Sequence, residues 1–360
     1  MSEVSYLDLP ASIKQVDVTD LASILRQFPE QLEAATKEFS QLQLPADWAS
    51  CQQVIFCGMG GSAIGAELAC DLPAEFIRKP LLVVHDYELP AYADKNSLVV
   101  VITYSGATEE ALACWQAALK RGCKLLVVTG GQKLADAARA KGVLCYHFNY
   151  PTQPRDALGY LFAPLLRVLV QARVITPAQA DLTPAIKQLK KLVPQYDLAN
   201  PTDKNLAKEL AYLVLDRVPQ IIAGRFLAGV AKRWKNQFNE HSKSAAWFDL
   251  LPELDHNTLE GFAWPPRYAD DTIIFLLRSS YEHPEVNRRA DIFHAWLRAK
   301  KILVNQLVPA VGGDWWSEKL SLVLLGDWVS YYLALLHRVD PVAIPNIISL
   351  KQQLRHGKTV

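Results

Sequence analysis

The feature that most constrains this chain is an alternation of short apolar runs with longer helical patterns. The segments are, in chain order, strand 53–57, helix 63–70, strand 81–85, strand 97–103, helix 108–120 and strand 124–129. Apolar runs of this kind are buried on both faces, as in parallel sheets that helices cover on both sides. The sequence therefore predicts a doubly wound α/β fold of three layers.

The pattern recurs with an offset of about 170 residues, which predicts a duplicated α/β domain. Residues 219–224 repeat the strand and glycine of 53–58, residues 271–279 repeat 97–105, and residues 301–305 repeat 124–128. A helix is expected at about 21–42 and another at 184–193. The predicted divisions are a helical arm at 1–48, a first domain at 49–170, a helical linker at 171–204 and a second domain at 205–360 that ends in a helix.

The composition excludes several classes of protein. Among 360 residues, 38 are basic and 37 acidic, so the net charge of +1 gives no field to hold a nucleic acid. The longest apolar stretch, 320–336, is interrupted by Asp327, and no export signal opens the chain, so we expect no membrane partner and a cytoplasmic protein. The six cysteines form no C-x-x-C and no cysteine or histidine spacing suits zinc, so we expect no metal and no other cofactor.

A glycine-rich turn follows the first strand. Backbone N–H groups at such a turn and at the start of the next helix attract an anion, so Gly60, Gly61 and Ser62 are candidates for binding a phosphate. Two alternatives remain open at this point. The turn can be purely structural, or Gly58-x-Gly60-x-x-Ala63 can be a dinucleotide fingerprint with Asp86 as the ribose ligand.

A second, hydroxyl-rich loop follows strand 97–103. The hydroxyls of Thr103, Ser105 and Thr108 surround a glycine at the start of the next helix, where they can converge on one small anion. Loops after neighbouring parallel strands project from the same sheet edge, so both loops are expected to receive one phosphate. Thr108 is also expected to be a helix N-cap, which is compatible with this function.

At these residues the chain resembles the sugar isomerase (SIS) superfamily and, almost end to end, the bifunctional phosphoglucose/phosphomannose isomerases with two SIS domains. The matching blocks are GMGGS at 58–62, QPR at 153–155, WKNQFNE at 234–240, LPELDHN at 251–257 and LGDWVS at 325–330. The second loop departs from the family's S-Y-S-G-N-T, because Thr103 replaces a serine and Ala107 an asparagine. The resemblance implies glucose 6-phosphate, fructose 6-phosphate and mannose 6-phosphate as ligands.

The resemblance also implies catalytic roles for Glu240 and Arg155. Glu240 is the implied base that moves a proton between C1 and C2, and Arg155 is the implied cation beside the cis-enediolate. By periodicity alone, Glu240 lies late in a helix at 227–243, on a polar row with Arg233, Asn236 and Gln237, and is expected to be a solvated carboxylate. Without the resemblance, Arg155 would likewise be expected to be a loop arginine in solvent.

Ring opening is assigned by the same resemblance to His256, with help from Lys351. His256 lies beyond Pro252 and cannot share a helical face with Glu240, and in related isomerases this histidine comes from the neighbouring subunit. We therefore expect a homodimer. The alternative for His256 is a loop histidine bonded to Asp255. Lys351, in a helix at 346–355, is expected to point its ammonium towards the protein body, and the alternative is that it extends into solvent.

Three functions are consistent with these residues. The expected one is an aldose-ketose isomerase that acts on a phosphosugar through a cis-enediol. A phosphosugar-binding regulator without catalysis is the first alternative, although no DNA-binding segment is visible. A dinucleotide-dependent oxidoreductase is the second alternative, which the hydroxyl-rich loop disfavours.

Overall fold

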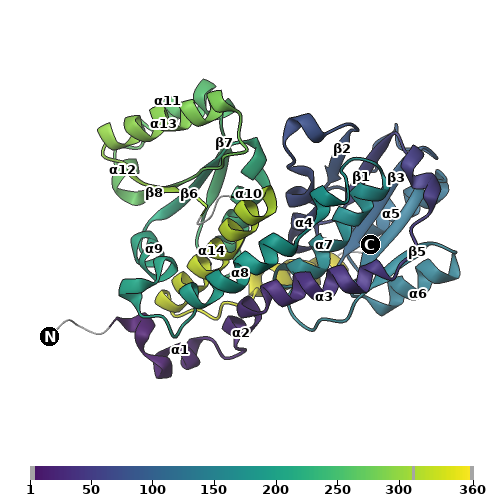
Figure 1. The fold of residues 1–360 in the computed structure, drawn as a ribbon. Coiled ribbons are helices and arrows are strands. Elements are labelled where there is room, and N and C mark those ends of the chain that lie inside the picture. Colours follow the sequence, from purple (N-terminus) through teal and green to yellow (C-terminus); the bar gives the residue numbers. More distant parts are fainter. Residues whose placement is uncertain (1–4, 310–312, 357–360) are drawn as a thin grey trace.

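The computed structural model describes residues 5–309 and 313–356, which form two α/β domains lying side by side (Figure 1). Each domain contains one parallel sheet, with strand orders β2-β1-β3-β4-β5 and β7-β6-β8-β9. The strands are β1 (Gln53–Cys57), β2 (Leu81–Val84), β3 (Ser97–Thr103), β4 (Lys124–Thr129), β5 (Leu144–His147), β6 (Val218–Ala223), β7 (Trp247–Leu250), β8 (Thr272–Leu277) and β9 (Leu303–Leu307). The fold class predicted from the alternation is confirmed.

The first sheet is buried on both faces because successive side chains of a strand point to opposite sides. Val54 and Phe56 of β1 pack into the core formed with α4 and α7, whereas Ile55 and Cys57 pack into a separate cluster with α5 and α6. The helices are α4 (Gly60–Cys70), α5 (Glu109–Lys120), α6 (Gln132–Ala140) and α7 (Leu158–Gln171). The result is the three-layer arrangement expected from the sequence.

The second sheet has the same construction. Ile221 and Phe275 face the core shared with α10 and α14, and Ile222 and Ile274 face a smaller cluster with α13. The helices are α10 (Ala228–Glu240), α13 (Pro284–Ala299) and α14 (Trp315–Leu336). Because one core cluster contains residues of both domains, the two sheets are joined by continuous packing rather than by a flexible linker.

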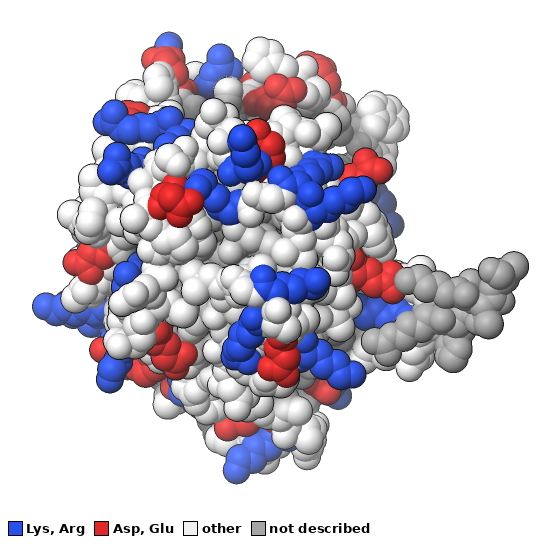
Figure 2. All heavy atoms as spheres, turned by 90° about the vertical axis from the view of Figure 1, so that its right-hand side faces the viewer, with Lys and Arg blue, Asp and Glu red and all other residues white. Residues whose placement is uncertain are grey.

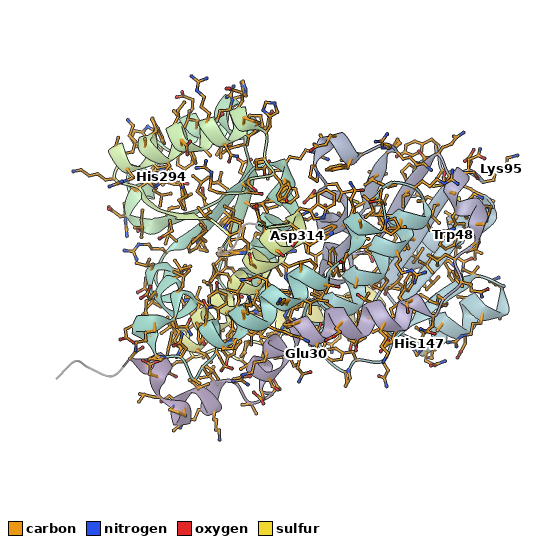
Figure 3. All side chains as sticks on the ribbon, viewed as in Figure 1. Glu30, Trp48, Lys95, His147, His294 and Asp314 are labelled. Carbon is orange, nitrogen blue, oxygen red and sulfur yellow. The ribbon has the colours of Figure 1, made fainter. Side chains whose placement is uncertain are left out.

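Helix α14 is the central element of that packing. It is the one helix of the described residues long and apolar enough to cross a membrane, yet its side chains are buried inside the protein. Its first turn is capped by Asp314, which accepts hydrogen bonds from the backbone N–H groups of Trp316 and Ser317 and lies at the junction of the domains in Figure 3. The length and apolarity of α14 therefore reflect a core position.

The remaining helices connect the domains and form the two ends of the chain. The expected helix at 21–42 is two helices, because Pro29 lacks the N–H that a continuous helix needs and occupies the start of α3 instead. The α-helices are α1 (Pro10–Val16), α2 (Leu21–Arg26), α3 (Phe28–Ser40), α8 (Thr183–Tyr196), α9 (Leu206–Val214), α11 (Thr258–Gly261), α12 (Tyr268–Asp271) and α15 (Pro345–His356). The 3-10 helices are η1 (Tyr6–Asp8), η2 (Ala46–Ser50), η3 (Ala74–Phe76), η4 (Pro154–Asp156), η5 (Ala178–Ala180), η6 (Thr202–Lys204), η7 (Arg225–Leu227) and η8 (Glu253–His256).

Charges on the surface are mixed in sign. Figure 2 shows basic and acidic side chains interspersed over the face that the first domain presents. This distribution agrees with the nearly balanced composition of the chain.

Candidate active site

The glycine-rich turn leads directly from β1 into α4. The helix begins at Gly60, three residues earlier than the sequence pattern predicted, and Gly60 itself has a positive φ of 50°. Ser62 is buried and its Oγ accepts a hydrogen bond of 3.0 Å from the backbone N–H of Tyr104. That bond joins the two loops that the sequence predicted to act together.

The second loop follows β3, the neighbour of β1 in the sheet. The buried hydroxyl of Thr103 lies 3.0 Å from the hydroxyl of Thr108 and accepts a hydrogen bond from the N–H of Gly106. Thr108 occupies the N-cap position of α5, but its side chain makes no hydrogen bond to the helix N–H groups. Ser105 is exposed and Ala107 donates its N–H to the Ser105 hydroxyl. The two loops thus form a cradle of hydroxyls and helix N-termini suited to a phosphate.

Arg155 lies against this cradle. Gly61 packs so closely on η4 that a Cβ at this position would lie 2.6 Å from the backbone nitrogen of Arg155. Glycine is therefore required at position 61 for the glycine-rich turn to lie against the backbone of Arg155. No other residue has a side chain small enough for this approach.

The side chain of Arg155 is buried, with 2% of its surface exposed, and does not extend into solvent. One Nη atom donates to both the Pro341 and Val342 carbonyl oxygens, each at 3.0 Å. The other Nη donates to Glu240 Oε2 at 3.1 Å. The guanidinium is thereby held on one side by backbone carbonyls and directed on the other towards the carboxylate.

Glu240 is the last residue of α10 and reaches the site from the second domain. Its side chain is partly exposed, at 23%, whereas its partner Arg155 is enclosed. The polar row on which it lies is not a solvated face, which corrects the expectation from periodicity. Arg233 and Gln237 are buried and both bind the carboxylate of Asp327, from the LGDW segment of α14.

A buried network lies behind the Arg155 and Glu240 pair. His241 lies 3.3 Å from Asp156 through Nε2 and 3.0 Å from the Ser330 hydroxyl through Nδ1. Burial raises the pKa of Asp156, but the hydrogen bond to His241 and the charges of His241, Arg155 and Arg233 outweigh it, so that pKa lies below its ordinary value. Asp156 is therefore an ionised carboxylate that balances the arginines within the protein.

Sequence reasoning missed Asp156, His241 and Lys243. Lys243 has a positive φ of 58° and folds back, so that its ammonium donates to the Glu240 carbonyl oxygen at 2.5 Å and to the His241 carbonyl oxygen at 3.1 Å. Desolvation and the charge of Arg155 lower the pKa of Lys243 to about 8. Their positions next to the matched QPR and WKNQFNE blocks were the available signal.

His256 and Lys351 are not brought to this pair within one chain. Both side chains are exposed, and no interaction described for residues 5–309 and 313–356 joins either of them to Glu240 or Arg155. The expectation that Lys351 points into the protein body is wrong. From Pro345 to Leu354, α15 is exposed, including its apolar residues Ile348 and Leu350.

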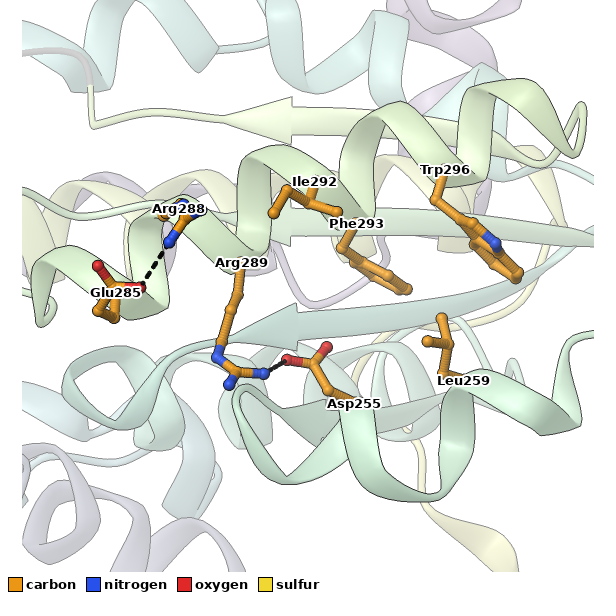
Figure 4. A pocket seen from close by; sticks show the side chains of 8 residues that line it. All are labelled: Asp255, Leu259, Glu285, Arg288, Arg289, Ile292, Phe293 and Trp296. Atoms are coloured by element: carbon orange, nitrogen blue, oxygen red, sulfur yellow. Dashed lines mark hydrogen bonds and ion pairs between the residues drawn. The ribbon is translucent and has the colours of Figure 1, made fainter.

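A cavity of about 360 Å³ lies beside the His256 segment, between η8 and α13 (Figure 4). None of the catalytic or phosphate-binding residues predicted from the sequence lines this cavity. Its charged side chains are paired with one another, since Arg289 binds Asp255 at 2.7 Å and Arg288 binds Glu285 at 3.3 Å. The cradle with Arg155 and Glu240 is therefore the stronger candidate for the active site.

Comparison with known proteins identifies relatives over nearly the whole chain. A family model described as the bacterial phospho-glucose isomerase C-terminal SIS domain matches residues 203–354. A bifunctional phosphoglucose/phosphomannose isomerase of Caldicellulosiruptor bescii is 34% identical over 92% of this chain and 97% of its own. The protein of the same name from Aquifex aeolicus is 33% identical over 90% of this chain and 97% of its own.

Solved structures share the architecture. Tagatose-6-phosphate ketose/aldose isomerase from Escherichia coli superposes with a TM-score of 0.69 at 16% identity, covering 89% of this chain and 95% of that one. At this identity the likeness concerns the fold alone.

Proposed function

Because the chain belongs to the family of bifunctional phosphoglucose/phosphomannose isomerases, we propose that it interconverts glucose 6-phosphate and mannose 6-phosphate with fructose 6-phosphate. The observation that carries the proposal is the position of Arg155. This buried cation adjoins the phosphate cradle through Gly61 and contacts the carboxylate of Glu240. One anchored sugar can therefore meet a positive charge and a base at its reacting end.

The cradle binds the phosphoryl group at C6. The hydroxyls of Ser62, Ser105 and Thr108 and the N-termini of α4 and α5 supply donors and positive dipole ends at one sheet edge. Anchoring at C6 fixes the distance to C1 and C2 of the open-chain sugar. The reacting carbons then lie beside Glu240.

Glu240 acts as the base. Its carboxylate takes the proton from C2 of the aldose, which gives a cis-enediolate with its charge on O1. The hydroxyl proton then passes from O2 to O1, and Glu240 returns its proton to C1 to give the ketose. Both C2 epimers of the aldose form the same enediolate, which is why glucose 6-phosphate and mannose 6-phosphate can share one site. A positioned base of this kind contributes about 10²- to 10⁴-fold to the rate.

Arg155 stabilises the charge that develops on the enediolate oxygen. One Nη of Arg155 binds Glu240, while the other Nη is fixed on the carbonyl oxygens of Pro341 and Val342. The O1 carbonyl oxygen of the bound open-chain sugar can take the place of the carboxylate on the first Nη, which frees the base before it removes the C2 proton and places the guanidinium beside the oxygen on which negative charge then develops. A preorganised donor of this kind contributes about 10²- to 10³-fold.

Ring opening is carried out by His256 of a second subunit, assisted by Lys351, so the active unit is a homodimer. The exposed positions of both side chains and the exposed apolar face of α15 support a site completed by another copy of the chain. The cysteines are free thiols, which supports a reducing compartment such as the cytoplasm.

Turnover without any added cofactor tests this function. Wild-type protein incubated with fructose 6-phosphate should form glucose 6-phosphate and mannose 6-phosphate, and in ²H₂O some deuterium should enter C1 or C2. Glu240→Gln should retain phosphosugar binding and lose nearly all turnover. The control Glu209→Gln, which changes an exposed glutamate on α9, should leave turnover unchanged. Phosphosugar binding by the wild type without turnover supports a regulatory protein instead.

A further inference from the structure

The second domain contains a counterpart of the phosphate cradle. Strands β6 and β8 occupy the central positions that β1 and β3 hold in the first sheet. A glycine follows both β1 and β6, at Gly58 and Gly224, and a loop with two serines, Ser279 and Ser280, follows β8 as the hydroxyl-rich loop follows β3. The duplication has therefore produced a second loop pair at the corresponding sheet edge.

A carboxylate of the protein itself fills this second loop pair. The side chain of Glu282 lies so close to Gly224 that a Cβ on the glycine would overlap its carboxyl group. Glu282 Oε1 accepts a hydrogen bond of 3.3 Å from the backbone N–H of Leu227, at the turn into α10. A backbone N–H at this turn is a donor of the kind that the first domain directs at its phosphate.

Donors and cations surround Glu282 inside the protein. Burial raises the pKa of its carboxyl group above the ordinary value, and the N–H groups of Phe226 and Leu227 and the charges of Lys319 and Arg225 offset only part of that rise. Lys319 is itself fully buried, so its charge is not screened by water. The second loop pair therefore combines a backbone N–H donor at the helix turn with nearby basic side chains, the groups of which anion sites are built.

A second carboxylate of the protein accepts hydrogen bonds from the hydroxyls of the serine loop. Glu318, on the first turn of α14, accepts hydrogen bonds from the Ser279 hydroxyl at 2.5 Å, from the Ser280 hydroxyl and from the Ser280 N–H at 3.1 Å. Glu318 is 3% exposed. In the first domain, by contrast, Gly60 and Ser105 of the cradle are open to solvent.

We propose that the second domain holds a phosphate cradle that is closed by its own carboxylates, Glu282 at the helix turn and Glu318 at the serine hydroxyls. Each chain therefore binds one phosphosugar, although it contains two SIS domains. The proposal rests on the proposed function only in taking the first cradle as the substrate site. Removal of the Glu282 carboxylate should leave an empty site for an inorganic oxyanion.

Binding stoichiometry is the first test. Glucitol 6-phosphate, which has no carbonyl group and cannot be isomerised, should titrate wild-type protein to one molecule per chain in calorimetry. Two molecules per chain would overturn the proposal. Isomerase activity is measured separately on the same protein, and its absence would count against the proposed function. This inference concerns the number of open anion sites, which a titration with inorganic phosphate measures whether or not the protein is an isomerase.

Opening the second cradle is the second test. With the first cradle saturated by glucitol 6-phosphate, inorganic phosphate at about ten times its Kd should raise the Tm of Glu282→Ala by roughly 3 °C. The matched control, Glu285→Ala, removes an exposed glutamate on α13 that pairs with Arg288, and should show no such rise. Equal responses of the two variants would overturn the proposal. Retained isomerase activity checks that Glu282→Ala folds, and if it does not fold the wild-type stoichiometry still decides.

Discussion

The Arg155 guanidinium and the Glu240 carboxylate lie 3.1 Å apart, although one belongs to the first domain and the other to the second. Each side chain is positioned by a different element, since Arg155 is in η4 after the first sheet and Glu240 ends α10 beside the second. The site therefore depends on the packing between the domains. Across that packing, Arg233 donates a hydrogen bond to the carbonyl oxygen of Arg155, while its ion pair with Asp327 fixes it within the second domain.

Replacing Arg155 tests its part in stabilising the enediolate. Arg155→Lys should lower kcat by about 10²- to 10³-fold, because an ammonium cannot bind the two backbone carbonyls and the reacting oxygen at once. KM should change less, because the phosphate is held by the loops. Steady-state kinetics with fructose 6-phosphate measure both constants. Arg298→Ala, which removes an exposed arginine from α13, is the control, and similar kcat values for the two variants would contradict the assignment.

Replacing Ser62 tests the phosphate cradle. Ser62→Ala removes the hydroxyl that joins the two loops through the N–H of Tyr104, and should raise KM and the inhibition constant of inorganic phosphate together, each by about tenfold. The kcat should change less, because Arg155 and Glu240 are untouched. Ser50→Ala, whose exposed hydroxyl binds only a local carbonyl, should change neither constant. A rise in KM without a rise in the phosphate inhibition constant would show that Ser62 acts on something other than the phosphate.

Mixing two inactive variants tests whether His256 acts in the neighbouring subunit. Glu240→Gln and His256→Ala homodimers should each be inactive. Unfolding and refolding an equal mixture should form heterodimers with one intact site, and restore about a quarter of the wild-type specific activity. If His256 acts within its own chain, both sites of the heterodimer lack a residue and no activity returns. Size-exclusion chromatography of the refolded mixture shows whether dimers have formed.

Much of the fold could be predicted from the sequence because parallel strands buried on both faces are nearly continuous apolar runs. The strands β1, β3 and β4 have the predicted bounds. The start of α4 was missed, because Gly60 and Gly61 are poor helix formers and the position of Gly61 is set by its close approach to Arg155. A helix start that is set by a tertiary contact leaves no signal in the local sequence.

The site was harder to predict than the fold for a related reason. Hydrophobic periodicity records which residues are polar and not which polar residues have partners. Periodicity alone therefore predicted a solvated Glu240, whereas Arg233 and Gln237 of the same polar row bind Asp327 from a distant helix inside the protein. Lys351 was expected to face the protein body because apolar residues flank it, but nothing in the described part of the chain covers that face of α15.

Asp156 should make the stability of the protein depend on pH in the acid range. The folded protein holds the pKa of Asp156 below the ordinary value of 3.8, so between these two values the unfolded chain binds more protons than the folded one. The contribution of this carboxylate is therefore fully present above about pH 4 and is lost as the pH falls through the lower, folded pKa. Asp156→Asn removes that dependence and leaves His241 without its carboxylate partner.

The expected result is a stability difference that varies with pH. At pH 7, Asp156→Asn should be less stable than the wild type by about 3 kcal/mol, the usual cost of removing one partner of a buried ion pair. The difference should shrink as the pH falls below about 4, because the wild type then loses the same interaction. Urea unfolding followed by circular dichroism from pH 3 to pH 7 measures it. Asp136→Asn, which removes an exposed carboxylate paired with Arg139, is the control, and a difference that stays constant over this range for Asp156→Asn would show that the carboxylate is not ionised in the folded protein.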